Sequence, residues 1–350
     1  MTLSLRELEQ ATVHDHHVAD NFIAHYYAAK SGPTRAGIVF HQGLNVTAAH
    51  YEYHNRFLAQ QGYAVLSLEA PWHNGPGPFT LDQMVENFYA GHRYVRWEIG
   101  AKPVFYAGHS LGATAALAAL YGYDRNFSAL EQSLQQGELD QARPLLEACL
   151  DKKKPDGLLL TGTPLDYRHL VPFQGIVKPL LLRMPLWSAR LLANLGANWS
   201  NRLVYPWHRH KRQKIIDYPD HKGLHIMYCK IEDKEHFVTT LSSIPYFYGL
   251  LPKIQGSQER LVQEYHHRVS SVPKHFFVGG LDAVLKFPIR LKHYRRMRKE
   301  YEKSESAQVH WLPLLSHIYA TNEFTSNTLR IQHLEHPQFN ECIQQCLGAL

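Results

Sequence analysis

A Gly-x-Ser-x-Gly pentapeptide lies between two segments whose composition predicts different secondary structures. The residues before it, KPVFYAG (102–108), are rich in β-branched and aromatic side chains and end at a glycine, which is typical of a buried parallel strand. The residues after it, LGATAALAALYGY (111–123), are rich in helix formers and predict a helix that ends at Gly122 and Tyr123. A chain that passes from strand to helix through so short a turn is expected to form an α/β fold.

The pentapeptide itself is expected to form a strained turn. Ser110 stands where the strand would meet the helix, and Gly108 and Gly112 flank it at the two closest points of approach. A side chain at either glycine would clash, and the serine would have to adopt unusual dihedral angles. This context is typical of a nucleophile elbow, a turn that exposes a reactive serine hydroxyl. The alternative is a plain glycine-rich connection.

Predicted strands and helices alternate along the rest of the chain, apart from one long interruption. Strands are expected at about residues 21–29, 36–43, 63–71, 102–110, 157–164, 275–282 and 307–315. Helices are expected at about residues 48–62, 80–98, 111–123, 286–303 and 337–349, with more helix up to about residue 150. Such alternation predicts βαβ units and a mostly parallel, doubly wound sheet.

Between about residues 165 and 268 the alternation stops, and the chain becomes rich in aromatic residues, prolines and basic residues. We interpret this region as a helical cap inserted over the sheet. The sequence therefore predicts an α/β core formed by residues 1–164 and 269–350, with the cap formed by residues 165–268.

Composition narrows the possible partners. The chain has 350 residues, 45% of them hydrophobic and 19% charged, as in an ordinary globular protein. Its net charge of +6 is concentrated at residues 207–214 and 286–303, which are interpreted as solvated helix faces or, alternatively, as a weak contact with an anionic membrane surface. Neither segment belongs to a nucleic-acid-binding motif, so no nucleic-acid partner is expected.

The histidines, the cysteines and the apolar segments indicate whether a metal site is expected and in which cellular compartment the protein is expected. Of the 24 histidines, the clusters at 14–17, 208–210 and 266–267 lack the i, i+4 spacing with a nearby acid that a helical zinc site uses, so no metal site is expected. The four cysteines form no C-x-x-C pair, which favours a reducing compartment. The N-terminal residues lack an apolar signal core, and the most apolar stretch is interrupted by charges and prolines. A cytoplasmic location is expected.

A serine nucleophile needs a base, a group that orients the base, and donors for the oxyanion. In a parallel sheet these groups converge at the carboxyl ends of the strands. Asp282 follows one expected strand and His317 follows the next, which gives the chain order Ser110, Asp282, His317. Asp166 also follows a strand and is the alternative acid, in which case Asp282 would only cap the next helix.

This chain order resembles that of the α/β-hydrolase superfamily. The segment VFHQGLNVTAAHYEYHNRFLAQQGYAVLSLEAP (39–71) is also similar to the lysophospholipase and monoglyceride-lipase-like branch, most clearly in LAQQGYAV. The resemblance covers about residues 36–123 and 272–320. Two departures are present: a glutamine interrupts the usual His-Gly pair in HQG, and APWHNGPGP replaces the usual Asp…Gly-His-Gly loop.

The resemblance implies a mechanism and its residues. Ser110 would attack a carbonyl carbon, His317 would accept and later return the proton, and Asp282 would orient the imidazole. The oxyanion would be held by backbone N–H groups of Leu111 and of the loop at Gly43 and Leu44. The remaining candidate substrate-binding residues are His41, Gln42, His109 and Trp187.

The expected activity is hydrolysis of a small-molecule carboxylic ester, with a lipid-like ester as one candidate, through an acyl-enzyme and with no metal or organic cofactor. A thioesterase or a serine peptidase would use the same three residues, because they do not dictate the leaving group. Outside the enzymes, the alternative is a hydrolase-like scaffold that only binds.

Overall fold

The computed structural model describes the larger part of the expected α/β core. The described residues are 13–19, 22–30, 32–43, 48–69, 81–151, 153–163, 272–279 and 306–312, with 185, 187–188, 191, 194–195, 295, 298–299, 341 and 344–345. The expected cap, 165–268, lies almost entirely outside them, so the proposed domain boundaries stay a prediction.

The core is an eight-stranded sheet in the order β1-β2-β4-β3-β5-β6-β7-β8. The strands are β1 (Val13–Ala19), β2 (Phe22–Tyr27), β3 (Ala36–His41), β4 (Tyr63–Leu68), β5 (Val104–His109), β6 (Gly157–Thr161), β7 (Lys274–Gly279) and β8 (Ala307–Leu312). From β4 to β8 every neighbouring pair is parallel, whereas β1 pairs antiparallel with β2, and β2 with β4. The mostly parallel sheet expected from the sequence is confirmed.

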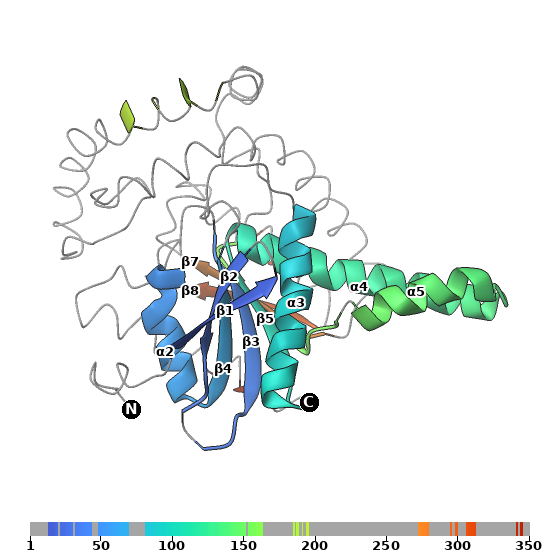
Figure 1. The fold of residues 1–350 in the computed structure, drawn as a ribbon, viewed down its shortest axis with the longest axis horizontal. Helices are drawn as coiled ribbons and strands as arrows, with labels where there is room; N and C mark the ends of the chain where they lie inside the picture. The colour runs from blue at the N-terminus through green and yellow to red at the C-terminus, as the bar shows by residue number, and fades with distance from the viewer. Residues whose placement is uncertain are drawn as a thin grey trace.

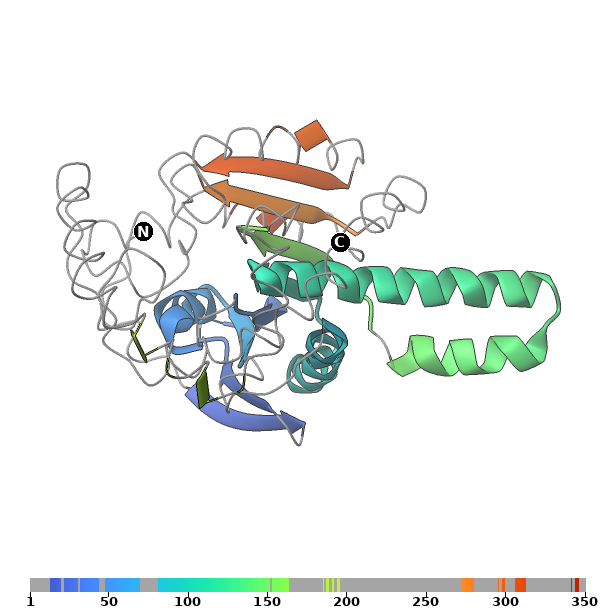
Figure 2. The same cartoon turned by 90° about the horizontal axis from the view of Figure 1, so that it is seen from above.

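Helices cover both faces of this sheet, as a doubly wound fold requires (Figure 2). The short helix η1 (Ala48–Tyr51) leads into α2 (Glu52–Gln60) on one face, and α3 (Leu81–Ile99) and α4 (Leu111–Gln135) lie on the other. Successive side chains of β3 point to opposite faces of the sheet. Ile38 packs in the hydrophobic cluster on the α2 side, and Val39 packs in the hydrophobic cluster on the side of α3 and α4. Because helices cover both faces, the side chains on either side of the central strands are buried.

Helix α4 is longer than the sequence predicts. Its expected end at Gly122 and Tyr123 is wrong, because the helix continues to Gln135 and then turns back as α5 (Leu139–Asp151). The two helices form a hairpin that projects from the body of the molecule (Figures 1 and 2). Gly122 does not end the helix because it lies inside it, close to the Tyr89 hydroxyl of α3, which a β-carbon there would approach to 3.1 Å.

Two further elements complete the sheet and its surroundings. Strand β1, which the sequence analysis did not predict, forms one edge of the sheet and includes the His-rich stretch at 14–17. Near the C-terminus, residues 341 and 344–345 are helical, in agreement with the helix expected there. The Gln344 amide donates a hydrogen bond of 2.6 Å to the Tyr63 hydroxyl, which brings the C-terminal region against the start of β4.

Candidate active site

Ser110 lies at the sharp turn between β5 and α4. Its backbone has φ 53° and ψ −113°, and among the described residues it is the one non-glycine residue with a positive φ. Its N–H donates to the Thr161 carbonyl of β6 at 2.8 Å, and its carbonyl accepts the Ala113 N–H at 3.1 Å. These two hydrogen bonds hold the Ser110 backbone in a sparsely populated conformation, and such strain is concentrated at functional sites.

The two flanking glycines make this turn possible. A β-carbon at Gly108 would come within 2.4 Å of the Gly112 carbonyl oxygen. A β-carbon at Gly112 would come within 2.1 Å of the His41 carbonyl oxygen and 2.7 Å of the Gln42 carbonyl oxygen. The clashes expected from the sequence are therefore present, and both involve backbone atoms that cannot rotate away. The close approach also brings the end of β3 against the start of α4.

The structure brings two of the expected oxyanion donors to the serine. Leu111 is the first residue of α4, and the first N–H groups of a helix have no carbonyl partner within it. Gly43, just after β3, lies against the turn, because a β-carbon there would be 3.0 Å from the Ser110 β-carbon. Helix N-termini favour negative charge, so an oxyanion formed here would be stabilised. Leu44 lies outside the described residues.

His41 and Gln42 are fully buried beneath this loop. The His41 ring packs 5.9 Å from that of Phe88, and its Nδ1 lies 3.1 Å from the Gln42 carbonyl oxygen. The Gln42 side-chain amide donates to the Ser67 hydroxyl of β4 at 3.2 Å. These contacts favour a role in shaping the loop over direct contact with a substrate.

His109 and Tyr51 form a contact that the sequence analysis missed. The Tyr51 hydroxyl and His109 Nδ1 are hydrogen-bonded, and both side chains are almost completely buried. Tyr51 lies 58 residues before His109, so neither periodicity nor local motif could pair them. The available signal was a tyrosine shortly after the glycine of the β3 loop, in the segment that resembles the lipase-like branch.

The proposed acid and base, Asp282 and His317, and the alternative acid Asp166 lie outside the described residues. The strands that precede Asp282 and His317 are described. Asp282 follows β7, which ends at Gly279, and His317 follows β8, which ends at Leu312. Gly279 and Leu312 are paired in register in neighbouring parallel strands, so both segments leave the sheet at the edge where β5 ends.

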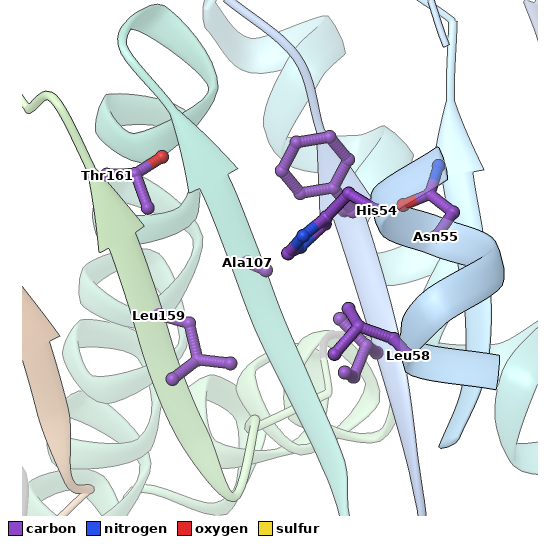
Figure 3. A pocket seen from close by; sticks show the side chains of 8 residues that line it. His54, Asn55, Leu58, Ala107, Leu159 and Thr161 are labelled. Atoms are coloured by element: carbon purple, nitrogen blue, oxygen red, sulfur yellow. The ribbon is translucent and has the colours of Figure 1, made fainter. Parts of the chain in front are cut away.

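Two further features are the Trp187 side chain and a small pocket beside α2. The Trp187 side chain is 70% exposed, so it is not buried against the turn. A small pocket of about 10 Å³ lies between α2 and the sheet and does not include Ser110 (Figure 3). It is lined by Ile38, Phe40, His54, Asn55, Leu58, Ala107, Leu159 and Thr161. Its volume is at the lower limit for one water molecule, and burial lowers the pKa of His54 to about 4, so this ring is neutral near pH 7.

Within the described part of the chain, no three His, Cys, Asp or Glu side chains gather as metal ligands would. A search of the same residues for helices of bilayer-spanning length and hydrophobicity finds none.

Comparison with known proteins identifies the family. Residues 38–323 match the α/β-hydrolase family, and the chain belongs to it. The fold described above, with a strained serine between the fifth strand and the following helix, is that of an α/β hydrolase. No curated protein sequence matches the chain.

Solved structures with the same fold have several activities. A haloalkane dehalogenase from Bradyrhizobium elkani is 12% identical, with a TM-score of 0.54 and coverage of 97% of this chain and 100% of that one. A carboxyl esterase from Bacillus coagulans is 14% identical, with a TM-score of 0.53 and coverage of 96% and 98%. A monoglyceride lipase from Saccharomyces cerevisiae is 13% identical, with a TM-score of 0.52 and coverage of 96% of each chain. At these identities the likeness establishes the fold and does not select among the activities, nor does it specify the lipase-like branch.

Proposed function

We propose that the protein is a serine hydrolase that cleaves carboxylic esters through an acyl-enzyme. The observation that carries the proposal is the strained conformation of Ser110 at the N-terminus of α4, with Gly43 against it. A serine hydroxyl in this position can attack a carbonyl carbon while the Leu111 and Gly43 N–H groups receive the developing negative charge. The esterase and the lipase among the structures with this fold are consistent with the same chemistry.

In the proposed mechanism His317 and Asp282 complete the site. His317 accepts the Ser110 proton as the Ser110–acyl bond forms, and returns it to the departing alcohol as the ester bond breaks. Water then attacks the acyl-enzyme, with His317 accepting its proton and returning it to Ser110 as the Ser110–acyl bond breaks and the acid is released. Asp282 holds the imidazole in the required tautomer. The parallel pairing of β7 with β8 supports this assignment, because both residues follow strands that end at the same edge.

Labelling with a fluorophosphonate tests the nucleophile. Wild-type protein should be labelled covalently, and Ser110→Ala should not, while the circular dichroism of the variant stays unchanged. Equal labelling of the two proteins, or no labelling of either, would contradict the proposal. Labelling without ester turnover would indicate that the natural bond is a thioester or an amide, and comparison of acyl thioesters and aminoacyl amides would then identify it.

The acid is tested by a matched pair of variants. Asp282→Asn should reduce kcat for a p-nitrophenyl ester by about 10⁴-fold, as the corresponding change does in another triad enzyme, because the asparagine holds the wrong imidazole tautomer. Asp166→Asn should cost far less. The opposite ranking would assign the acid to the segment after β6.

We also propose that the substrate is lipid-like and is met at an anionic membrane surface. Three apolar side chains in the expected cap support this idea: Trp187, Leu191 and Leu195 are 70%, 53% and 55% exposed. They are spaced four residues apart, and the residues described around them are helical, so they share one helix face. The net charge of +6 would favour anionic lipid.

Co-sedimentation with vesicles tests this second proposal. Wild-type protein should bind phosphatidylglycerol vesicles more tightly than phosphatidylcholine vesicles, and added salt should weaken the difference. Trp187→Ser should reduce binding, whereas Trp97→Ser should not, since Trp97 is also exposed but lies on α3. Equal binding by all three proteins would show that this face does not contact lipid.

A further inference from the structure

The last residue of β5 links the nucleophile to a second loop. His109 immediately precedes Ser110 and is 2% exposed. Its Nδ1 is hydrogen-bonded to the hydroxyl of Tyr51, a fully buried residue at the end of η1. The two ring centroids are 5.8 Å apart, with an angle of 56° between the planes. This contact therefore joins the turn at Ser110 to the segment that follows β3.

The same imidazole also touches the start of that segment. A β-carbon added at Gly43 would be 2.9 Å from His109 Nδ1 and 3.0 Å from the Ser110 β-carbon. Gly43, whose backbone carries a proposed oxyanion donor, therefore lies against both the imidazole and the nucleophile. A movement of His109 would change the spacing between Gly43 and Ser110.

The segment is held at its other end as well. The N–H of Ala48, the first residue of η1, donates to a Glu69 carboxylate oxygen at 2.9 Å. The same carboxylate lies 3.3 Å from His25 Nε2 of β2. Helix η1 is thus attached through Ala48 to the end of β4 and through Tyr51 to the end of β5. Both attachments are hydrogen bonds to the central sheet.

We propose that Tyr51 and His109 are positioning residues that set the distance between Gly43 and Ser110, and so place the oxyanion donor against the nucleophile. This inference rests on the proposed function. A phenol is a stronger hydrogen-bond donor than a neutral imidazole N–H, and an imidazole nitrogen is a stronger acceptor than a phenol oxygen. The Tyr51 hydroxyl therefore donates to His109 Nδ1, which places the ring N–H on Nε2.

The burial of the pair makes this arrangement persistent. Breaking the hydrogen bond would leave a donor and an acceptor without water to replace it, which is costly inside a protein. Removing the hydroxyl takes away one of the contacts that hold the imidazole, which should let Gly43 shift relative to Ser110. Because a misplacement of about 1 Å can cost about 100-fold in rate, we expect a loss of about 10- to 100-fold in kcat.

Tyr51→Phe tests the inference against Tyr89→Phe as the matched control. The Tyr89 hydroxyl is equally buried and donates one hydrogen bond of 2.6 Å to the Ala119 carbonyl, well along α4 from the active site. Tyr51→Phe should lower kcat and the rate of fluorophosphonate labelling while leaving KM and the unfolding temperature close to those of Tyr89→Phe. Equal kcat in the two variants would overturn the inference.

Substitution of His109 provides a second, independent measurement. His109→Asn keeps an acceptor oxygen near the position of Nδ1, so it should retain more activity than His109→Ala. In a Tyr51→Phe background this advantage should disappear, because the hydroxyl that donates to the asparagine is absent. An equal advantage in both backgrounds would show that His109 acts independently of Tyr51 and would overturn the inference.

Failure of the proposed function and failure of the positioning role give different labelling results. If wild-type protein reacts with the fluorophosphonate at Ser110 and Tyr51→Phe reacts at the same rate, the proposed function stands and the positioning role falls. If wild-type protein does not react at Ser110, the proposed function fails and the positioning role falls with it.

Discussion

Ser110 combines a strained backbone with a set of contacts that hold the strain in place. A positive φ at a non-glycine residue costs on the order of 1–3 kcal/mol, so surrounding interactions must offset it. Here the Thr161 carbonyl accepts the serine N–H, while Gly108 and Gly112 allow the strand and the helix to touch backbone to backbone. The glycines are therefore as necessary to the site as the hydroxyl that they help to expose.

A substitution at Gly112 should reveal this requirement. Gly112→Ala would place a methyl group 2.1 Å from the His41 carbonyl oxygen, so the start of α4 must move away from β3. We expect a loss of about 3 kcal/mol in the free energy of unfolding, measured by urea denaturation, together with much slower fluorophosphonate labelling. Gly122→Ala, in the same helix, is the control: its β-carbon meets only the end of the Tyr89 side chain, so stability should stay within about 1 kcal/mol of wild type. Equal losses in the two variants would contradict this account.

Site features that depend on neighbouring residues in the sequence could be predicted, whereas contacts between residues far apart in the sequence could not. The pentapeptide around Ser110 specifies its own turn, so the clashes at its two glycines follow from sequence. The pairing of Tyr51 with His109 depends on how η1 packs against the sheet, and no local sequence pattern specifies that packing. For the same reason, the buried contacts of Gln42 became apparent only in the structure.

At the scale of elements, strands β2 to β8 could be predicted from the sequence, whereas strand β1 and the end of helix α4 could not. Strands β3 to β6 are short apolar runs between turn signals, and each is buried throughout. Strand β1 has a polar, His-rich sequence without an apolar run, so no strand pattern marks it in the sequence. Helix α4 exceeded its expected length because packing against α3 and α5 outweighs the weak helix propensity of Gly122.

In the projecting hairpin, helix α5 contains a proline, which disfavours a helix. Pro144 lies inside α5, where it cannot donate a backbone hydrogen bond and its ring crowds the preceding turn. Pro144→Ala should stabilise α5 by up to about 3 kcal/mol. Hydrogen exchange followed by mass spectrometry should show slower exchange over residues 139–151 and little change in β3 or β5. Unchanged exchange in α5 would show that the helix already accommodates the proline without cost.

For the molecule as a whole, three buried histidines predict a loss of stability in acid. Burial lowers the pKa of His92 to about 3, with nearby Arg96, Lys153 and Arg93 contributing, and lowers that of His54 to about 4. Burial, with a contribution from His310, lowers the pKa of His275 to about 4. In the unfolded chain each ring titrates near pH 6.5. Above that pH neither state binds the proton, so these rings have no effect on stability.

Below pH 6.5 the unfolded chain takes up protons that the folded protein excludes, so the free energy of unfolding falls as the pH drops toward 4. Each histidine costs about 1.4 kcal/mol per pH unit over its window, so the three together remove on the order of several kcal/mol, a large part of a typical domain's stability. Urea denaturation between pH 7.5 and 4.5 should show this decline, and His92→Gln should make it shallower by about one proton, because glutamine does not titrate. A flat profile across that range, or an unchanged slope in the variant, would mean that these rings are protonated in the folded protein.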